Sequence, residues 1–418
     1  MSGDGDAPAE RLGLFEAFGV ELETMLVDAE TLSVRPECDE LVARVGGSAD
    51  ADVEFGDIAW SNELTLHVLE LKTNGPAPSL SGLTGKFHEG IRRANQELAS
   101  MGARLMPGAV HPWMDPHIET RLWPHEYTEV YHTFDRIFGC SGHGWANLQS
   151  THLNLPFADD EEFGRLHAAI RLVLPLIPAL SAASPYLDGA RTPELDARLV
   201  AYRSNARRVP SVTGLVVPEP AFTRDQYERE ILGRIYADMA PLDPDGILRH
   251  EWANARGAIA RFDRGSVEVR IIDAQECPAA DLAVVAAVTE VVRALAVGPL
   301  ALRDPTKDPG TEALAAILER TTADGERAEL SFSELLRVLG LDSTPRSAGD
   351  VWKVLLDRFP PSDPDDEWTS ALEGILGHGP LGRRLVAALG ESPDRGAMSG
   401  VFGDLCGCLE RNEVFEAG

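Results

Sequence analysis

Residues 266–273 read Ser-Val-Glu-Val-Arg-Ile-Ile-Asp, and the rest of the chain can be interpreted outward from this stretch. In an extended backbone successive side chains point to opposite faces, so the two valines and Ile271 lie on one face while Glu268 and Arg270 lie on the other. The stretch therefore predicts a strand with an apolar back. A strand of this buried type that carries Glu and Arg at core-sized positions is expected to hold something polar.

Two further stretches repeat this arrangement. Residues 18–27 predict a strand that places Glu21 and Glu23 on one face and aliphatic side chains on the other. The Ser-Thr-His-Leu-Asn-Leu stretch that follows puts His152 and Asn154 on one face, with leucines behind them. Three strands that each offer a polar pair at i and i+2 predict a sheet with one apolar face and one polar face rich in carboxylates. That polar face is the candidate active site.

Two more glutamates belong to a stretch at residues 62–72 that predicts another strand, ended by Asn-Gly-Pro. Lys72 lies on the same face as Glu70. Glu63 and Glu70 are separated by an odd number of residues, so on one regular strand they would face opposite ways. If both serve one site, either Glu63 precedes the strand or a bulge intervenes.

The remaining pattern is mainly helical. Helical periodicity predicts helices at about 86–101, 160–180, 225–239, 279–297, 311–321, 332–339, 349–358, 366–376, 380–389 and 398–412. Pro175 and Pro178 predict a kink or an early end in the second of these helices. Ser331 and Glu334 have the spacing of a capping box before an apolar run.

The organisation expected from this pattern has three parts: a mobile tail at 1–13, a catalytic region at 14–300, and a helical C-terminal region at 301–418 packed on it.

The composition excludes several classes of partner. The chain has 418 residues, 44% of them hydrophobic and 25% charged, as in an ordinary globular protein. Its formal net charge of −29 repels nucleic acid and anionic membranes, and we expect neither as a partner. The apolar run at 282–297 is interrupted by two charged residues and is too short to span a bilayer, so it predicts a buried helix.

The five cysteines are irregularly spaced, which indicates free thiols in a reducing cytoplasm. The Cys406-x-Cys408 pair lacks the spacing of a zinc site. Residues 1–11 lack the basic and apolar regions of a signal peptide. We therefore expect a cytoplasmic protein.

The five glutamates of the predicted polar face would repel one another if they converged without a countercharge. At an effective dielectric near 20, two carboxylates about 4 Å apart cost on the order of 4 kcal/mol. Mg²⁺ or Mn²⁺ would relieve this repulsion, since hard divalent cations prefer oxygen ligands.

Each polar pair also has an ordinary structural explanation: a solvated strand face for Glu21 and Glu23, a core histidine for His152, and a cross-strand ion pair for Glu268 with Arg270. The coincidence of three pairs, each with an apolar reverse face, favours a site. The sequence contains no glycine-rich phosphate loop, so any bound ATP must be held through metals and arginines.

Five segments stand in an order that resembles glutamate–cysteine ligases and the wider group of carboxylate–amine ligases. They are residues 19–23, 63–73, 150–154, 180–186 with Arg203, and 267–273. The resemblance runs from about residue 14 to residue 300. It implies an α+β, glutamine-synthetase-like fold in which a curved, mainly antiparallel sheet forms a basin with helices behind it.

The resemblance also implies ATP and two or three Mg²⁺ ions as ligands. It gives metal-binding positions to Glu21, Glu23, Glu63, Glu70, His152 and Glu268. It places Glu268 and Arg270 in the catalytic machinery, and Arg203, Lys72 and Asn154 in the binding of substrate or ATP.

The implied reaction joins the γ-carboxylate of glutamate to the amino group of cysteine through an acyl phosphate. Three alternatives stay open: a ligase that uses a different carboxylate or amine, a non-catalytic nucleotide-binding relative, and a metal-dependent hydrolase. The sequence does not indicate the oligomeric state, and the expected partners are the small-molecule substrates.

Overall fold

The computed structural model of the protein describes residues 11–301, 309–344 and 346–417. The predicted mobile tail at 1–13 falls mostly on residues 1–10, which lie outside the described residues. Within the described part of the chain, a large sheet and a set of helices share one continuous hydrophobic core that includes side chains from Phe15 to Leu409.

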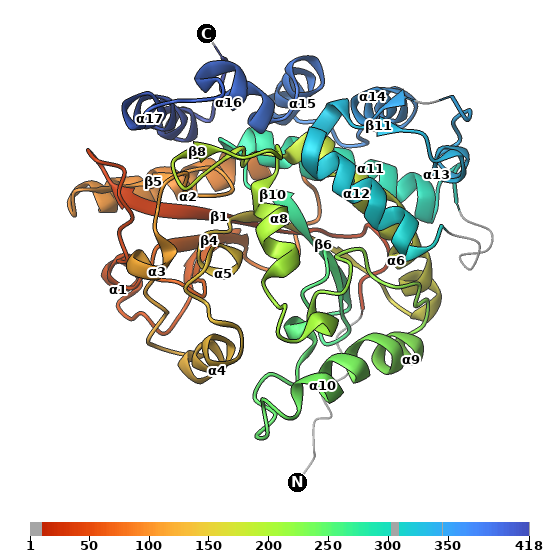
Figure 1. Ribbon diagram of the computed structural model, residues 1–418, viewed down its shortest axis with the longest axis horizontal. Helices are drawn as coiled ribbons and strands as arrows, with labels where there is room; N and C mark the ends of the chain where they lie inside the picture. The colour runs from red at the N-terminus through yellow and green to blue at the C-terminus, as the bar shows by residue number, and fades with distance from the viewer. Residues whose placement is uncertain (1–10, 302–308, 345, 418) are drawn as a thin grey trace.

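The large sheet has eight strands, and every paired neighbour runs antiparallel. Seven strands follow the spatial order β2 (Val53–Phe55), β3 (Ile58–Asn62), β4 (Val68–Thr73), β1 (Gly19–Asp28), β6 (Ser150–Pro156), β10 (Ser266–Asp273) and β9 (Ala258–Arg261). The eighth, β5 (Ala103–Met106), pairs with the second half of β1. This arrangement confirms the predicted mainly antiparallel α+β fold (Figure 1).

Helices pack on the apolar back of the sheet. Helix α2 (Leu83–Ala99) contacts β3, β4 and β5, α6 (Asp160–Val173) contacts β10, and α11 (Pro278–Ala296) packs against both helices. All but one residue of α11 are buried, which confirms the buried helix predicted from its composition. Among the helices of the described residues, none combines the length and the apolar composition that a bilayer-spanning segment requires.

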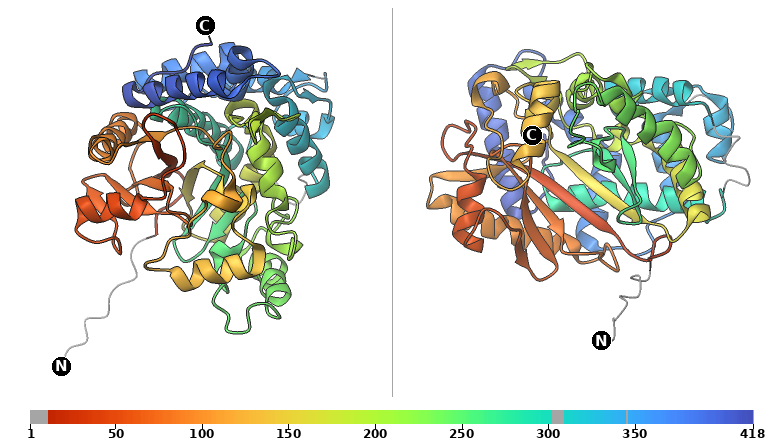
Figure 2. Two further views of the ribbon diagram at one scale, coloured as in Figure 1. Left: turned by 60° about the vertical axis from the view of Figure 1, so that its left-hand side comes forward. Right: turned by 90° about the horizontal axis from the view of Figure 1, so that it is seen from below.

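The last part of the chain is helical, as predicted. It contains α12 (Thr311–Asp324), α13 (Ser333–Val338), α14 (Ala348–Arg358), α15 (Asp366–His378), α16 (Leu381–Leu389) and α17 (Arg395–Arg411). Helix α15 packs on α11, and α17 packs on α2 and β5. Helices α15 to α17 form a layer along one side of the molecule, as Figure 1 and the left view of Figure 2 show.

Shorter elements fill the connections between the strands. They are α1 (Cys38–Gly46), α3 (Pro116–Glu119), α4 (Thr128–Phe138), α5 (His143–Ala146), α7 (Pro178–Ser181), α8 (Ala197–Ser204), α9 (Arg224–Tyr227), α10 (Gly233–Met239), and the two-residue strands β7 (Tyr186–Leu187), β8 (Ala190–Arg191), β11 (Glu329–Leu330) and β12 (Arg346–Ser347). A π-helical turn at Glu228–Leu232 joins α9 to α10. All five cysteines are free, as predicted, and all five are buried.

Two local predictions need correction. Residues 62–72 form no single strand, because Asn62 ends β3 and β4 begins only at Val68. Glu63 therefore precedes its strand, which is the first of the two alternatives considered for it. The predicted capping box is also wrong: α13 starts at Ser333 after Phe332, with no side-chain cap bond. Ser331, the predicted cap, thus lies one residue upstream of the position from which a side chain could cap the first turn.

Prolines interrupt the predicted helix at 160–180, as expected. Helix α6 ends at Val173, a 3₁₀ turn spans Leu174–Leu176, and α7 begins with Pro178 as its first residue. Proline lacks the backbone N–H that an uninterrupted helix would need at these positions. The chain then turns toward the end of β10.

Candidate active site

The register of β1 with its two neighbours places acidic side chains opposite one another on the polar face. Glu21 lies opposite His152 of β6, and Glu23 lies opposite Glu70 of β4. Along the first half of β1 burial alternates residue by residue, with the glutamates partly exposed and the aliphatic side chains between them buried. The structure therefore brings together the polar faces that the sequence predicted.

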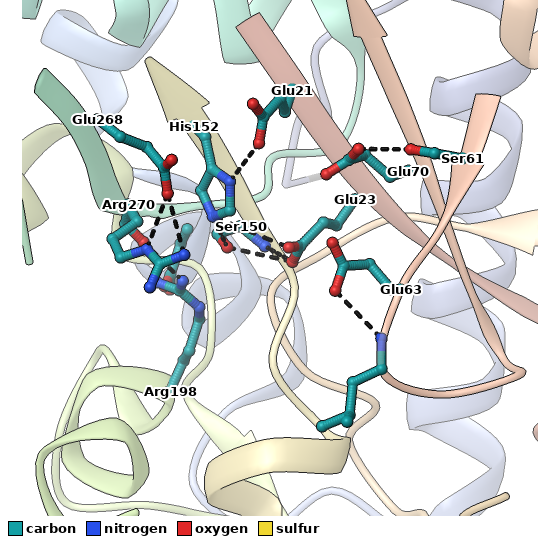
Figure 3. A network of polar contacts seen from close by, with 12 residues as sticks. Glu21, Glu23, Ser61, Glu63, Glu70, Ser150, His152, Arg198, Glu268 and Arg270 are labelled. Carbon is teal, nitrogen blue, oxygen red and sulfur yellow. Dashed lines mark hydrogen bonds and ion pairs between the residues drawn. The ribbon is translucent and has the colours of Figure 1, made fainter. Parts of the chain in front are cut away.

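His152 and Asn154 hold Glu21. Nδ1 of His152 lies 2.7 Å from Oε2 of Glu21 (Figure 3). Nδ2 of Asn154 donates to Oε1 of Glu21 at 3.1 Å. Asn154 in turn lies opposite Glu268 of β10. The central strand β6 thus connects the carboxylates of β1 with those of β10.

Ser150 holds Glu23. The backbone N–H of Ser150 donates to Oε2 of Glu23 at 2.6 Å, and its hydroxyl lies 3.1 Å from the same oxygen. The Ser150 hydroxyl also lies 2.9 Å from Nε2 of His152. Nε2 of His152 is 3.8 Å from Oε1 of Glu23, so one histidine lies between two carboxylates of β1.

Glu70 has a hydroxyl and an ammonium group as neighbours. The hydroxyl of Ser61 in β3 donates to Oε1 of Glu70 at 2.5 Å, and Nζ of Lys72 is 3.6 Å from the same oxygen. Lys72 lies closer to Asp52, at 2.9 Å. The lysine therefore divides its charge between two carboxylates and neutralises neither.

Glu63 reaches the cluster from the connection between β3 and β4. Its Oε2 accepts a hydrogen bond of 3.2 Å from the backbone N–H of Leu64, and its carboxylate points toward that of Glu23 (Figure 3). Burial raises the pKa of Glu63 well above its ordinary value, and the charges of Glu23 and Glu70 raise it further. The carboxylates of the cluster thus carry more negative charge than the neighbouring cations can offset.

The other members of the cluster differ in the direction in which their pKa values shift. Burial, reinforced by the charge of Glu21, raises the pKa of Glu70 to about 7. Burial opposes ionisation of Glu21 as well, but the hydrogen bond and charge of His152 outweigh it and lower the pKa of Glu21 to about 2. Burial alone would lower the pKa of His152, yet its contacts with Glu21 raise it to about 9.

A divalent cation fits these residues. One ligand atom each from Glu21, Glu70 and His152 lie within 4.8 Å of one another. Burial and the charges of neighbouring carboxylates raise the pKa values of Glu63 and Glu70, and a bound cation would favour their ionised forms. Carboxylate oxygens with one imidazole are a donor set that suits Mg²⁺ or Mn²⁺.

Glu268 lies among arginines on the β10 side of the cluster. Its Oε1 is 2.9 Å from Nη2 of Arg270, and its Oε2 is 3.4 Å from Nη1 of Arg261. Nη1 of Arg270 donates to the carbonyl of Asn254 at 3.4 Å. Burial alone would lower the pKa of Arg270, but the charge of Glu268 raises it instead, so its guanidinium stays charged.

Arg203 does not join this cluster. It lies on an exposed part of α8 and forms an ion pair with Glu319 of α12. A different arginine of the same helix, Arg198, is buried and reaches β10. Four residues of this network were not predicted as site residues from the sequence: Arg198, Arg261, Ser61 and Ser150. Ser150 lies on the same strand face as His152, so of these four residues it is the one that alternation could have indicated.

A cavity of about 590 Å³ opens beside the cluster. Its polar lining includes Glu21, Lys72, Asn154 and Arg264, and Phe18 and Phe262 contribute apolar side chains. It therefore offers cationic groups, an amide, carboxylates and apolar surface in one cavity. A molecule with an anionic end and a flat apolar end would match this lining.

Comparisons with known proteins agree with this geometry. A family model described as glutamate-cysteine ligase family 2 (GCS2) matches residues 17–398. An uncharacterized protein of Archaeoglobus fulgidus is 30% identical over 393 residues, which cover 93% of this chain and 97% of that protein. A Bordetella parapertussis protein named "Putative glutamate--cysteine ligase 2" is 28% identical over 268 residues, which cover 61% of this chain but only 55% of the relative.

Solved structures share the fold. The glutamate–cysteine ligase of Francisella tularensis in complex with AMP aligns with a TM-score of 0.59 and 12% identity, covering 94% of this chain and 88% of that chain. A bifunctional glutathione synthetase of Pasteurella multocida aligns with a TM-score of 0.55 and 12% identity, covering 96% of this chain and 52% of that chain. At this level of identity the likeness concerns the fold.

Proposed function

Because the chain belongs to glutamate-cysteine ligase family 2, we propose that it is an ATP-dependent ligase that joins the γ-carboxylate of glutamate to the amino group of cysteine. The observation that carries the proposal is the buried acidic cluster next to a cavity with cationic groups. Glu70 is buried and Glu63 half-buried, and burial together with nearby carboxylates raises the pKa of both, an arrangement that divalent cations relieve.

The proposed reaction has two steps. An oxygen of the glutamate γ-carboxylate attacks the γ-phosphorus of ATP, the bond from that phosphorus to the bridging oxygen breaks, and ADP leaves. The amine nitrogen then attacks the acyl carbon, the carbon–oxygen bond to phosphate breaks, and inorganic phosphate leaves as the amide forms. The amine loses one proton to solvent. Phosphoryl transfer of this kind asks the protein mainly for positioning and charge stabilisation.

The chain has residues for each of these tasks. We place the nucleotide in the cavity of about 590 Å³, where Lys72, Asn154 and Arg264 face it. Arg270 lies on β10, the neighbour of β6, and Glu268 holds its guanidinium at 2.9 Å. We assign Arg270 to the phosphoryl group in transfer, because its charge is fixed before the substrate arrives.

The same proposal assigns the divalent cations to the carboxylates. Glu21, Glu23, Glu63, Glu70 and His152 would hold Mg²⁺ or Mn²⁺, with Glu268 at the edge of the set. When bound, the metal offsets the charge of the nucleotide phosphates. We place the reaction in the cytoplasm, where free thiols such as the five cysteines persist.

An assay of ADP release tests the proposal. Purified protein is incubated with ATP, Mg²⁺ and pairs drawn from a panel of carboxylates and amines, and the products are identified by mass spectrometry. We expect glutamate with cysteine to give the fastest release and a product with the mass of γ-glutamylcysteine. E268Q should abolish the release because the variant leaves Arg270 and Arg261 without their buried counterion. E54Q, which alters an exposed glutamate of β2, should leave it unchanged.

Other results would identify the alternatives. A faster reaction with another amine would overturn cysteine as the acceptor and leave the ligase class intact. Nucleotide binding without turnover for any pair would indicate a non-catalytic relative. Metal-dependent hydrolysis that does not require ATP would contradict the ligase reaction altogether.

A further inference from the structure

The segment at residues 180–186 binds the end of β10. The backbone N–H of Ala183 donates to Oδ2 of Asp273 at 2.8 Å, and the hydroxyl of Ser184 donates to the same oxygen at 3.0 Å. Asp273 is fully buried. The segment thus supports the end of the strand that carries Glu268 and Arg270.

Arg198 completes this support. It follows the segment at the start of α8 and is only 2% exposed. Its Nη1 donates to Oδ1 of Asp273 at 3.2 Å, and its Nη2 donates to the backbone carbonyl of Arg270 at 2.9 Å. The backbone N–H of Arg198 also donates to the hydroxyl of Ser184 at 3.0 Å. One side chain therefore joins the strand end to the peptide of Arg270.

The peptide of Arg270 needs such a partner because the sheet is irregular there. The pairing of β10 with β6 shifts register between Val269 and Ile272. The backbone N–H of Arg270 donates to the carbonyl of Gly257 at 2.9 Å, and its carbonyl accepts from Arg198. Both polar backbone groups of Arg270 are thus bound outside β6. A strand irregularity of this kind redirects a side chain.

We propose that Arg198 is a positioning residue that fixes the backbone of Arg270 at this irregularity and so aims its guanidinium across the polar face. The inference rests on the proposed function only for the consequence in catalysis; the structural coupling of Arg198 to Arg270 stands on the contacts themselves.

Arginine suits this role better than lysine would. The planar guanidinium offers several N–H groups in a fixed fork, so one side chain reaches Asp273 and the carbonyl of Arg270 together. A lysine has one nitrogen at the end of a flexible stem. It could neutralise Asp273, but it would hold the Arg270 peptide less firmly. The variant R198K therefore separates the charge of Arg198 from its geometry.

A matched control exists elsewhere in the chain. Arg384 of α16 is 4% exposed, forms an ion pair with the fully buried Glu276, and donates to the carbonyl of Phe415 at 2.7 Å. It therefore has the same kinds of partner as Arg198, a buried carboxylate and a backbone carbonyl, without any contact to Arg270. R384K measures the general cost of replacing a buried arginine fork.

Hydrogen–deuterium exchange followed by mass spectrometry tests the coupling directly and needs no turnover. In R198K, we expect amides of the peptide covering residues 266–273 to exchange about tenfold faster than in the wild type, because the β10 irregularity loses one of its fixed ends. In R384K the same peptide should keep its wild-type exchange. Unchanged exchange in R198K, or an equal increase in both variants, would overturn the inference.

Steady-state ADP release tests the catalytic consequence. R198K should lower kcat about tenfold to a hundredfold with KM for ATP within about twofold, since misplacement of a reacting group affects the transition state most. R384K should keep the wild-type kcat. If R198K shows faster exchange but a wild-type kcat, positioning for catalysis is refuted. If the wild type turns over no substrate pair, the proposed function fails, and the exchange result still decides the coupling.

Discussion

Replacing Glu70 by glutamine is expected to stabilise the metal-free protein at pH 8. Burial and the charge of Glu21 raise the pKa of Glu70 from 4.5 to about 7. A carboxyl group with a raised pKa in the folded state prefers to stay protonated. Below pH 4.5 it is protonated in both the folded and the unfolded chain and its ionisation costs no stability, but as the pH rises to about 7 and beyond the fold must carry an unfavourable charge.

The size of this effect follows from the same values. The difference between 4.5 and about 7 corresponds to about 3 kcal/mol of unfolding free energy at pH 8. For a chain of 418 residues this free energy shifts the melting temperature by about 3 °C. Glutamine has nearly the same shape and can still accept from Ser61, while Lys72 keeps Asp52 at 2.9 Å. E70Q should therefore recover most of the 3 °C shift.

Calorimetry at pH 8 in EDTA and in Mn²⁺ measures the difference. E70Q should melt above the wild type in EDTA and gain less than the wild type from Mn²⁺, because the variant loses a ligand. Its advantage in EDTA should vanish near pH 4.5, where Glu70 is protonated. E54Q, a change at an exposed position of β2, should follow the wild type in every condition. A lower melting temperature for E70Q in EDTA, or equal gains from Mn²⁺, would refute the reasoning.

Three further outcomes are expected. Mn²⁺ should bind more tightly as the pH rises through about 7, because binding displaces protons from Glu63 and Glu70. Titration calorimetry in buffers of different ionisation enthalpy detects the released protons. An affinity for Mn²⁺ that does not change with pH would contradict this prediction. Burial lowers the pKa of His167 to about 3. The wild type should therefore lose about 3 kcal/mol of unfolding free energy between pH 6.5 and about pH 4, as the unfolded chain takes up the proton. In urea unfolding, the unfolding free energy of H167F should depend less on pH than that of the wild type. K72M should weaken ADP binding about tenfold by titration calorimetry, whereas K86M, which removes a surface ion pair, should not; equal affinities would remove Lys72 from the nucleotide site.

The strands that carry the site could be predicted because each has an apolar face and a polar face. Alternation along residues 18–27, 150–155 and 266–273 correctly placed the polar pairs of the three central strands on one face. It did not predict the register shift between Val269 and Ile272, which puts Ile272 in the hydrophobic core. The neighbouring β9 was missed, since all four of its residues are buried and a short buried run has no two-residue period. For the same reason β3, with four of its five residues buried, was missed apart from Asn62, which was assigned to the strand that follows it.

Position along the chain did not reveal which arginine of α8 points inward. Arg198 and Arg203 are five residues apart, which on a helix turns one about 140° away from the other. Only the packing of α8 against β10 and α12 decides which one is buried. The resemblance to known ligases therefore pointed to α8, but to Arg203, whose side of the helix does not contact the cluster; Arg198 does reach β10.

The distribution of charge divides the polar face into two halves. On the β10 side, two arginines flank Glu268, and that carboxylate is already neutralised. On the side of β4, Glu63 and Glu70 exceed the charge of Lys72, as their raised pKa values indicate. A nucleotide's phosphates can approach the first half unaided, but they are repelled by the second unless a cation lies between. Metal dependence should therefore arise from the β4 half, and anion recognition from the β10 half together with Lys72 at the cavity.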